Sequence, residues 1–191
     1  MSKYGKEDLE KACEVMRKGG VVLYPTDTIW GLGCDASNEE AVKRIFRIKQ
    51  RSDSKSMLVL LDNDAKLSYY VEDVPDQAYD LMDLSEKPVT IIYDGARHLA
   101  PQLIAEDGSV GIRITKEEFS RDLCARMRGA VVSTSANISG QPSPHFFAEV
   151  SQEIVDAVDY VVAYRRDDST PAVPSSIIKL GRGGLVKIIR E

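Results

Sequence analysis

Positive side chains are concentrated in one short part of an otherwise acidic chain. Residues 43–55 hold six cations against one acid, whereas the chain of 191 residues has a formal net charge of −5. The cations are Lys43, Arg44, Arg47, Lys49, Arg51 and Lys55. A concentrated positive patch on an acidic protein favours a small anionic ligand over a nucleic-acid coat. The chemistry we expect here is therefore electrostatic binding of a small anionic ligand.

The residues before this patch must position it. Val21 to Tyr24 is a short apolar run after a Gly-Gly break, which predicts a buried strand ending at Pro25. Thr26, Asp27 and Thr28 follow it, at the end of a strand, where open α/β sheets bind ligands. The strand end and the cations should therefore meet at one site.

A helix over residues 38–49 is predicted next. Ser37 and Glu40 form a capping-box pattern, and apolar residues recur at helical spacing behind it. Lys43, Arg44 and Arg47 lie in the middle of this helix, where they are explained equally well as ligand-binding groups or as a solvent-exposed face. Lys49, Arg51 and Lys55 differ, because they lie at or beyond the helix end, where they can converge with the strand-end threonines.

The rest of the chain alternates between strand and helix patterns. Apolar runs predict strands at 57–61, 88–93, 110–114, 130–132, 160–163, 176–180 and 185–189, and helical spacing appears at 9–16, 64–70, 76–86, 117–128 and 146–156. The small polar residues of 133–144 predict a turn, and 164–174 a loose segment that we interpret as a lid over the bound ligand. Strands alternating with helices predict an α/β fold, with a twisted, mostly parallel or mixed open sheet and flanking helices. We expect one domain over 1–191.

Several familiar sites are disfavoured. Residues 31–36 match G-x-G-x-x-A, but six residues separate the strand end from the first glycine, unlike the tight turn of a dinucleotide-binding fold. No Walker P-loop occurs, and His98 and His145 suit surface loops better than a catalytic triad. The odd number and wide spacing of Cys13, Cys34 and Cys124 predict reduced, mostly buried thiols. A charged N-terminus and no long apolar stretch predict a soluble, cytoplasmic protein without a membrane anchor.

Several spaced motifs, in this order, resemble those of the YrdC-like threonylcarbamoyl-AMP synthases in their short, single-domain form. They are VVLYPTDTIWGLGCDA at 21–36, Lys49-x-Arg51, VGIR at 110–113, STSANISGQPSP at 133–144, PSSII at 174–178 and KIIR at 187–190. Together they span nearly the whole chain, which makes the resemblance far more specific than any single motif. It implies a YrdC-like α/β fold with a concave cationic cavity.

The resemblance also implies an activity and a site. The reaction would join L-threonine, bicarbonate and ATP into L-threonylcarbamoyl-AMP and pyrophosphate, for N6-threonylcarbamoyladenosine formation in tRNA. By motif position, the catalytic tetrad would be Lys49, Arg51, Ser135 and Asn137. The threonine pocket would be lined by Thr28, Leu60, Arg113, Ser135 and Ser175. The ATP pocket would be lined by Arg51, Lys55, Ser109, Asn137, His145 and Arg190. Mg²⁺ is expected with ATP, without a metal site of the protein's own.

Four positions depart from the family's usual pattern, namely Ser56, Ser109, His145 and Lys179. The implied partner is the downstream tRNA threonylcarbamoyl transferase machinery. The alternative is an RNA-binding or regulatory module on the same fold. The acidic net charge and the lack of aromatic residues interleaved with basic ones along the sequence weigh against it. A weak RNA contact, the choice between threonine and serine, and the oligomeric state are left open.

Overall fold

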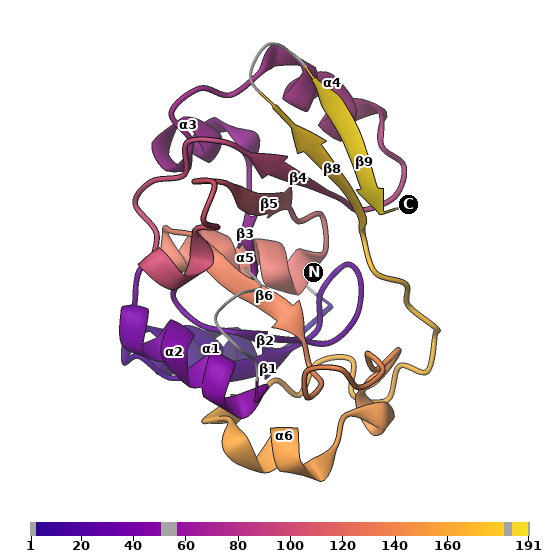
Figure 1. The fold of residues 1–191 in the computed structure, drawn as a ribbon. Coiled ribbons are helices and arrows are strands. Elements are labelled where there is room, and N and C mark those ends of the chain that lie inside the picture. The colour runs from indigo at the N-terminus through magenta and orange to yellow at the C-terminus, as the bar shows by residue number, and fades with distance from the viewer. Residues whose placement is uncertain (1–2, 51–56, 182–184, 191) are drawn as a thin grey trace.

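The protein is described from a computed structural model, which covers residues 3–50, 57–181 and 185–190 (Figure 1). Within these ranges one nine-stranded sheet has the strand order β7-β1-β2-β6-β3-β5-β4-β8-β9. The strands are β1 (Val22–Tyr24), β2 (Gly31–Gly33), β3 (Leu58–Leu61), β4 (Val89–Tyr93), β5 (Val110–Ile114), β6 (Val131–Ser135), β7 (Tyr160–Val161), β8 (Ser176–Leu180) and β9 (Val186–Arg190). The helices are α1 (Lys6–Arg17), α2 (Glu39–Ile48), α3 (Leu67–Tyr70), α4 (Asp76–Leu84), α5 (Glu118–Met127) and α6 (Gln152–Ala157).

The sheet is mixed, with antiparallel pairs more frequent than parallel ones in the described residues. The pairs β1–β7, β3–β5 and β4–β8 are parallel, and β1–β2, β2–β6, β3–β6, β4–β5 and β8–β9 are antiparallel. The prediction of a mixed α/β sheet is confirmed, and its mostly parallel form is wrong. The reason is β6, which enters antiparallel between β2 and β3 although it comes later in the chain.

Residues 31–33 form a strand where the glycine pattern suggested a turn. Tyr24 pairs with Gly31 and Val22 with Gly33, so the segment returns antiparallel along β1. This pairing rules out a phosphate-binding turn at this place. Glycine is required at position 33 because a Cβ there would lie 2.5 Å from a ring carbon of Tyr24 and 2.6 Å from the Val132 carbonyl.

Gly33→Ala is expected to destabilise the fold by about 1 to 3 kcal/mol, because the new methyl group meets a buried ring and a backbone carbonyl that cannot both move aside. Urea denaturation measures the loss. Gly5→Ala is the matched control, since a Cβ at Gly5 meets nothing within 4 Å and its φ of −70° suits alanine. Equal stability of the two variants would contradict this account of β2.

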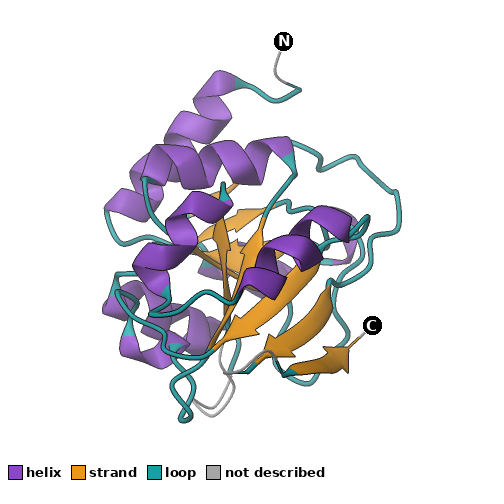
Figure 2. Cartoon of the chain, turned by 90° about the horizontal axis from the view of Figure 1, so that it is seen from above, coloured by secondary structure: helices purple, strands orange, loops and turns teal. Residues whose placement is uncertain are grey.

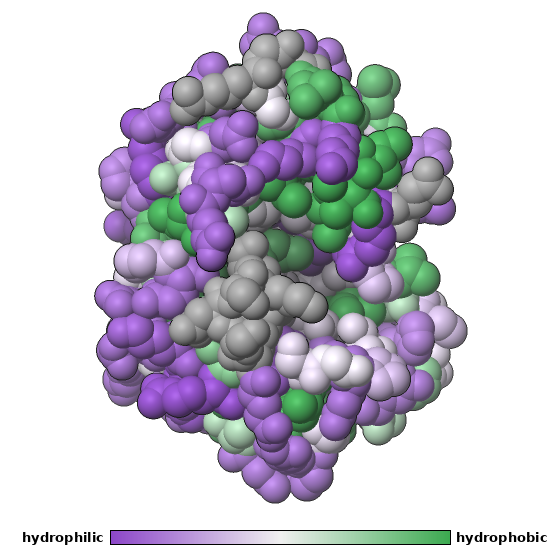
Figure 3. Space-filling view, in the orientation of Figure 1, coloured by the Kyte–Doolittle hydropathy of each residue, from purple (hydrophilic) through white to green (hydrophobic). Residues whose placement is uncertain are grey.

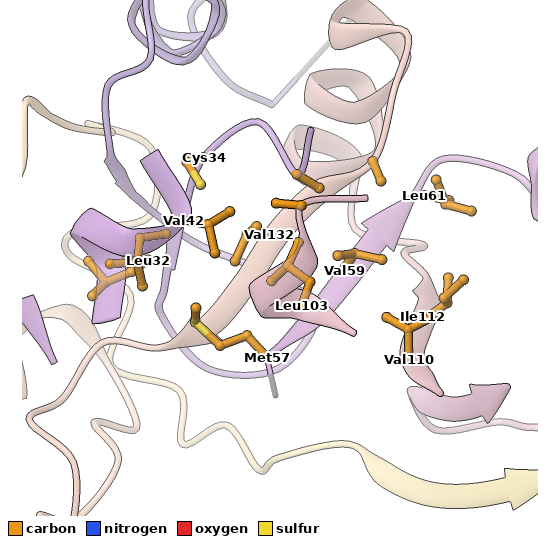
Figure 4. Packing of buried hydrophobic residues seen from close by; sticks show 14 of the residues in the cluster. Leu32, Cys34, Val42, Met57, Val59, Leu61, Leu103, Val110, Ile112 and Val132 are labelled. Atoms are coloured by element: carbon orange, nitrogen blue, oxygen red, sulfur yellow. The ribbon is translucent and has the colours of Figure 1, made fainter. Parts of the chain in front are cut away.

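Alternate residues of the central strands enter two separate hydrophobic cores. Leu23, Val59 and Val132 face the larger core, together with the apolar side of α2. Figure 4 shows Val59 and Val132 beside Val42 of α2. Val22 and Leu60 face the other side of the sheet, where α1 and α5 cover them. The sheet is thus a middle layer with helices on both faces, and the C-terminus lies at one margin of it (Figure 2).

The start of α2 differs from the predicted capping box. Asn38 is the N-cap, and its Oδ1 accepts a hydrogen bond of 3.0 Å from the Ala41 amide. Ser37 is instead engaged by Asp35, whose Oδ1 accepts from the Ser37 amide at 2.8 Å and from its hydroxyl at 2.7 Å. The capping box was therefore wrong because an aspartate two residues earlier competes for the serine.

Two further sequence predictions have clear outcomes. Cys13, Cys34 and Cys124 are free thiols in the buried core, as predicted. The predicted polar turn begins too early, because Ser133 to Ser135 continue β6 and pair with β2 and β3. In the part of the chain that the structure covers, no helix has the length and apolar character needed to cross a bilayer.

Candidate active site

A cavity of about 210 Å³ opens on the sheet face that carries α1 and α5, beside the parts of β3 and β6 that these helices cover. Seven separate stretches of the chain reach it, from both halves of the sequence. Its lining residues are Thr28, Ile29, Trp30, Gly31, Met57, Leu58, Arg113, Ser133, Thr134, Ser135, Ser143, Pro174, Ser175, Ile177 and Arg190. Strand register explains the convergence, because Leu58 pairs with Ser133 and Gly31 with Ser135 across β6.

The elbow after β1 places the Thr28 hydroxyl at this cavity in a defined hydrogen-bonding state. The Thr26 hydroxyl donates its proton to the Ile29 carbonyl at 2.8 Å and accepts from the Thr28 amide at 3.1 Å. The two threonine hydroxyl oxygens are 3.0 Å apart. Since the Thr26 proton is already used, Thr28 must donate to Thr26, and only acceptor lone pairs of Thr28 remain for the cavity. Such an acceptor suits an ammonium group or another cationic donor.

A buried ion pair with Asp27 holds Arg113, which lines the same cavity. The Arg113 guanidinium Nη2 lies 3.0 Å from Asp27 Oδ1, and the two side chains are 3% and 10% exposed. The Arg113 Nε is buried without a hydrogen-bond partner in the described residues. Burial raises the pKa of Asp27, and the positive charge of Arg113 opposes that rise. Arg113 is thus held by Asp27 while part of its planar donor fork remains unsatisfied, which suits a ligand carboxylate.

Arg190 brings a second guanidinium to the cavity from β9. Its Nε and Nη2 donate to the Ser175 carbonyl at 3.0 and 2.7 Å, and the Ser175 hydroxyl lies 2.8 Å from that of Thr90. Partial burial, with the like charge of Arg113, lowers the pKa of Arg190 from its usual value. Two cations held near each other in this way favour an anion between them.

The structure brings Lys49 and Asn137 together, although 88 residues separate them. The buried Lys49 ammonium donates to the Ser135 carbonyl, to the Asn137 carbonyl at 2.8 Å and to Asn137 Oδ1 at 3.3 Å. The side-chain amide of Asn137 in turn donates from Nδ2 to the Gln141 carbonyl at 2.6 Å. Lys49 therefore fixes the backbone that carries Ser135 into the cavity, and its amine points at carbonyls. Arg51, Lys55 and Ser56 lie outside the described residues.

Lys49 and Asn137 are not among the residues that line the cavity, and three other predicted residues are also absent from its lining. Leu60 is completely buried among the residues under α1 and α5, and Leu58, two residues earlier on the same face of β3, reaches the cavity instead. Ser109 is buried and donates to Asp107 Oδ1 at 2.5 Å. His145 is exposed, with its Nδ1 2.9 Å from the Ala172 carbonyl. Their roles toward ligands stay predictions.

The loop before β5 has an electrostatic anchor of its own. Lys179 lies 2.5 Å from Asp107, which also accepts from Ser109, and these bonds lower the pKa of Asp107 to about 2. An aspartate in an unfolded chain has a pKa of about 3.9. The stability contributed by Asp107 should therefore be complete above about pH 4 and be lost as the pH falls toward 2.

We expect Asp107→Asn to lower the free energy of unfolding by less than about 1 kcal/mol at pH 7, because the Asp107 side chain is 54% exposed. The difference from the wild type should vanish near pH 2. Urea denaturation across pH 2 to 7 measures both values, with Asp80→Asn on α4 as the control. A difference that stays constant with pH would show that the ion pair contributes nothing.

Sequence reasoning did not single out several lining residues. Trp30 forms part of the wall and its ring lies 4.8 Å from that of Phe147, measured between centroids. Asp27 was noted only as part of the elbow, and its pairing with Arg113 has no signal in the sequence. The alternation of side chains along β3 could have pointed to Leu58. The segment between β7 and β8 runs along the right side of the molecule in Figure 1, and Arg165 in it donates to the Thr26 carbonyl at 3.0 Å. Its role as a lid stays a prediction.

Comparison with known proteins identifies the family of this chain. The family model Sua5/YciO/YrdC, described as telomere recombination, matches residues 14–191. The threonylcarbamoyl-AMP synthase of Idiomarina loihiensis is 34% identical over 176 residues, covering 90% of this chain and 92% of that protein. The synthase of Pseudomonas aeruginosa strain PAO1 is 35% identical over 152 residues, covering 79% and 82%.

Solved structures show the same fold. A variant of P. abyssi Sua5 has a TM-score of 0.85 and 25% identity, covering 95% of this chain and 55% of that one. The P. abyssi Sua5 complex with L-threonine has a TM-score of 0.83 and 23% identity, covering 94% and 52%. The chain thus spans about half the length of P. abyssi Sua5. The match over most of its own length and the identity to its curated relatives show that the chain belongs to the Sua5/YciO/YrdC family.

Proposed function

We propose that this protein is a threonylcarbamoyl-AMP synthase, which converts L-threonine, bicarbonate and ATP into L-threonylcarbamoyl-AMP and pyrophosphate for tRNA modification. The observation that carries the proposal is the pairing, in one cavity, of the buried Arg113 fork with the acceptor-only hydroxyl of Thr28. Arg113 binds a carboxylate and Thr28 an ammonium group, so together they recognise a free α-amino acid. The curated relatives carry the name of this activity.

The amino-acid side of the reaction follows from these two groups. The Nη donors of Arg113 that Asp27 does not engage bind the α-carboxylate, while Asp27 keeps the guanidinium plane in place. Thr28 orients the amino group that bicarbonate converts into a carbamate. Ser175 and Ser135 add small polar surface around the side chain. L-threonine is also the ligand in the P. abyssi Sua5 complex, whose fold this chain shares.

The reaction at the α-phosphate of ATP needs positive charge from the protein and no protein nucleophile. A carbamate oxygen attacks the α-phosphorus while pyrophosphate leaves, so negative charge accumulates and positioning supplies most of the rate. Arg190 provides a fixed cation at the cavity, and Arg51 and Lys55 are proposed to add to it. Among the described residues no group of three or more His, Cys, Asp or Glu could hold a metal ion, so we assign Mg²⁺ to the phosphates of bound ATP.

The wider setting belongs to the same proposal. The unstable adenylate needs an acceptor enzyme that transfers its threonylcarbamoyl group to tRNA, and we place both steps in the cytoplasm, where ATP, threonine and tRNA meet. A non-synthase RNA-binding module is the less favoured alternative, because the curated relatives named above are synthases.

The direct test is pyrophosphate release from the purified protein with ATP, bicarbonate and threonine, and with each omitted in turn. We expect release only when all three are present, and incorporation of labelled bicarbonate into a nucleotide product. Replacing threonine by serine measures the choice of substrate. Release that does not depend on threonine, or no release from folded protein, would overturn the proposal.

A further inference from the structure

A second cavity, of about 360 Å³, shares no lining residue with the candidate active site. Three segments distant in the sequence meet there: residues 66–70 with α3, the loop at His98, and the connection 127–130 between α5 and β6. Helix α3 lies at the upper left of the molecule in Figure 1, whereas β8 and β9 lie at the upper right. Residues 35–37 complete its lining. Nothing in the proposed synthase reaction uses this place.

Two aromatic rings are stacked at this cavity. The ring centroids of Tyr69 and His98 are 4.1 Å apart with an angle of 23° between their planes, and Tyr69 is 56% exposed. The pair is fixed in position, because His98 Nδ1 lies 2.6 Å from the Tyr69 carbonyl and the buried Tyr70 meets Tyr69 edge to face. His98 is held at a φ of +57°, a conformation that side chains other than glycine adopt rarely. A rigid, exposed ring stack is a platform on which another planar group can stack.

Charged groups surround this platform on the cavity side. Lys66 and Arg128 line the cavity, and Arg97, next to His98, donates to the Ser68 carbonyl at 2.5 Å. Arg128 is exposed, while Lys66 is partly neutralised by Asp62 at 2.6 Å. Asp35 is the acid among the lining residues, and its Oδ1 is engaged by Ser37. The cavity therefore combines a stacking surface with positive charge at its edge, on a protein of net charge −5.

We propose that this cavity binds one nucleotide unit, with its base stacked on the Tyr69–His98 pair and its phosphate beside Lys66 and Arg128. Stacking is tolerant of base identity, and the cations supply the phosphate contact. Its volume falls within the range of sites for a single small ligand, which separates it from a flat protein interface. The unit is either a free mononucleotide or one nucleotide of a single RNA strand. Scanning the sequence for interleaved aromatic and basic residues missed this arrangement, because the rings and cations come from three segments.

The test uses a fluorescently labelled, unstructured oligo(A) RNA followed by anisotropy, and AMP followed by titration calorimetry, both at low salt. Tyr69→Ala should weaken binding of the nucleotide ligand about tenfold, whereas Tyr69→Phe should keep it. Tyr79→Ala is the matched control, since it removes another exposed tyrosine ring, on α4. Arg128→Gly should weaken binding and reduce its salt dependence, and glycine suits the φ of +57° at that position.

The two probes separate the two sources of the nucleotide. A loss confined to RNA assigns the site to a nucleic-acid strand, and a loss confined to AMP assigns it to a free nucleotide. Pyrophosphate release with threonine should be unchanged in Tyr69→Ala, which keeps this result distinct from failure of the proposed synthase activity. Wild-type affinity of folded Tyr69→Ala for both probes, or binding of neither probe to the wild type, would overturn the proposal and favour a protein contact.

Discussion

Replacing Lys49 with Met should lower the free energy of unfolding by about 3 kcal/mol and reduce threonine-dependent pyrophosphate release at least about a hundredfold. Met keeps most of the buried volume of Lys49 but donates no hydrogen bond, so the Ser135 and Asn137 acceptors are left unsatisfied. Each such buried group costs about 1 to 3 kcal/mol. Activity falls further because Ser135, which lines the cavity, loses its fixed position, and a shift of about 1 Å can cost a hundredfold.

The control for this variant is Lys43→Met on the same helix. Lys43 is 43% exposed and pairs with Glu39 and Glu40 on the surface of α2, where an ion pair contributes little. Urea denaturation and pyrophosphate release are measured for both variants. If Lys49→Met were as stable as wild type yet inactive, Lys49 would act on the substrate directly, as the family resemblance implied.

Arg113→Met is expected to be at least as destabilising as Lys49→Met. It leaves the Asp27 carboxylate buried without its cation, which costs about 3 to 5 kcal/mol when one partner of a buried pair is removed. The pKa of Asp27, already raised by burial, should rise further because the opposing charge is gone. A carboxyl whose folded pKa is raised costs stability in full above that pKa; the cost fades as the pH falls through it and is gone below the unfolded value of about 3.9. The stability deficit of this variant should therefore shrink in acid.

The double variant Asp27→Asn with Arg113→Met separates folding from substrate binding. Asparagine removes the buried charge, so the double variant should recover most of the stability that Arg113→Met loses. It should not recover threonine binding, since the carboxylate fork is absent, and we expect the KM for threonine to stay raised roughly a hundredfold. Calorimetric titration with threonine and urea denaturation measure the two effects. Recovery of threonine affinity in the double variant would mean that Arg113 does not hold the substrate carboxylate.

Much of the candidate site could be anticipated from motifs. Thr28, Arg113, Ser135 and Ser175 were expected in the threonine pocket and Arg190 in the ATP pocket, and all five line one cavity. The motif positions indicated all five, and strand-end reasoning indicated Thr28 alone, because it follows a strand at the place where open α/β sheets bind ligands. Leu60 is an exception to this agreement. It lies in the buried core, and Leu58, two residues earlier on β3, lines the cavity.

The exposed surface of β9 is a second feature that the local sequence does not predict. Large hydrophobic residues of β9, among them Val186, Ile188 and Ile189, are exposed, and Figure 3 shows hydrophobic residues gathered over β8 and β9. The sequence pattern predicted a strand here and the structure contains it. That this strand lies at the margin of the sheet, with its side chains in solvent, depends on strand order, which no local pattern encodes.

The sequence by itself determined the α/β class, the positions of most helices and strands, and the chemical character of the site, because periodicity and turn residues act locally. Only the tertiary structure decided which residues meet. The antiparallel entry of β6 between β2 and β3 brings Ser135 to Lys49, and the elbow turns Asp27 onto Arg113. The Tyr69–His98 stack likewise joins residues 29 positions apart. Such contacts depend on strand order and burial, which the whole chain sets at once, so the local sequence does not contain them.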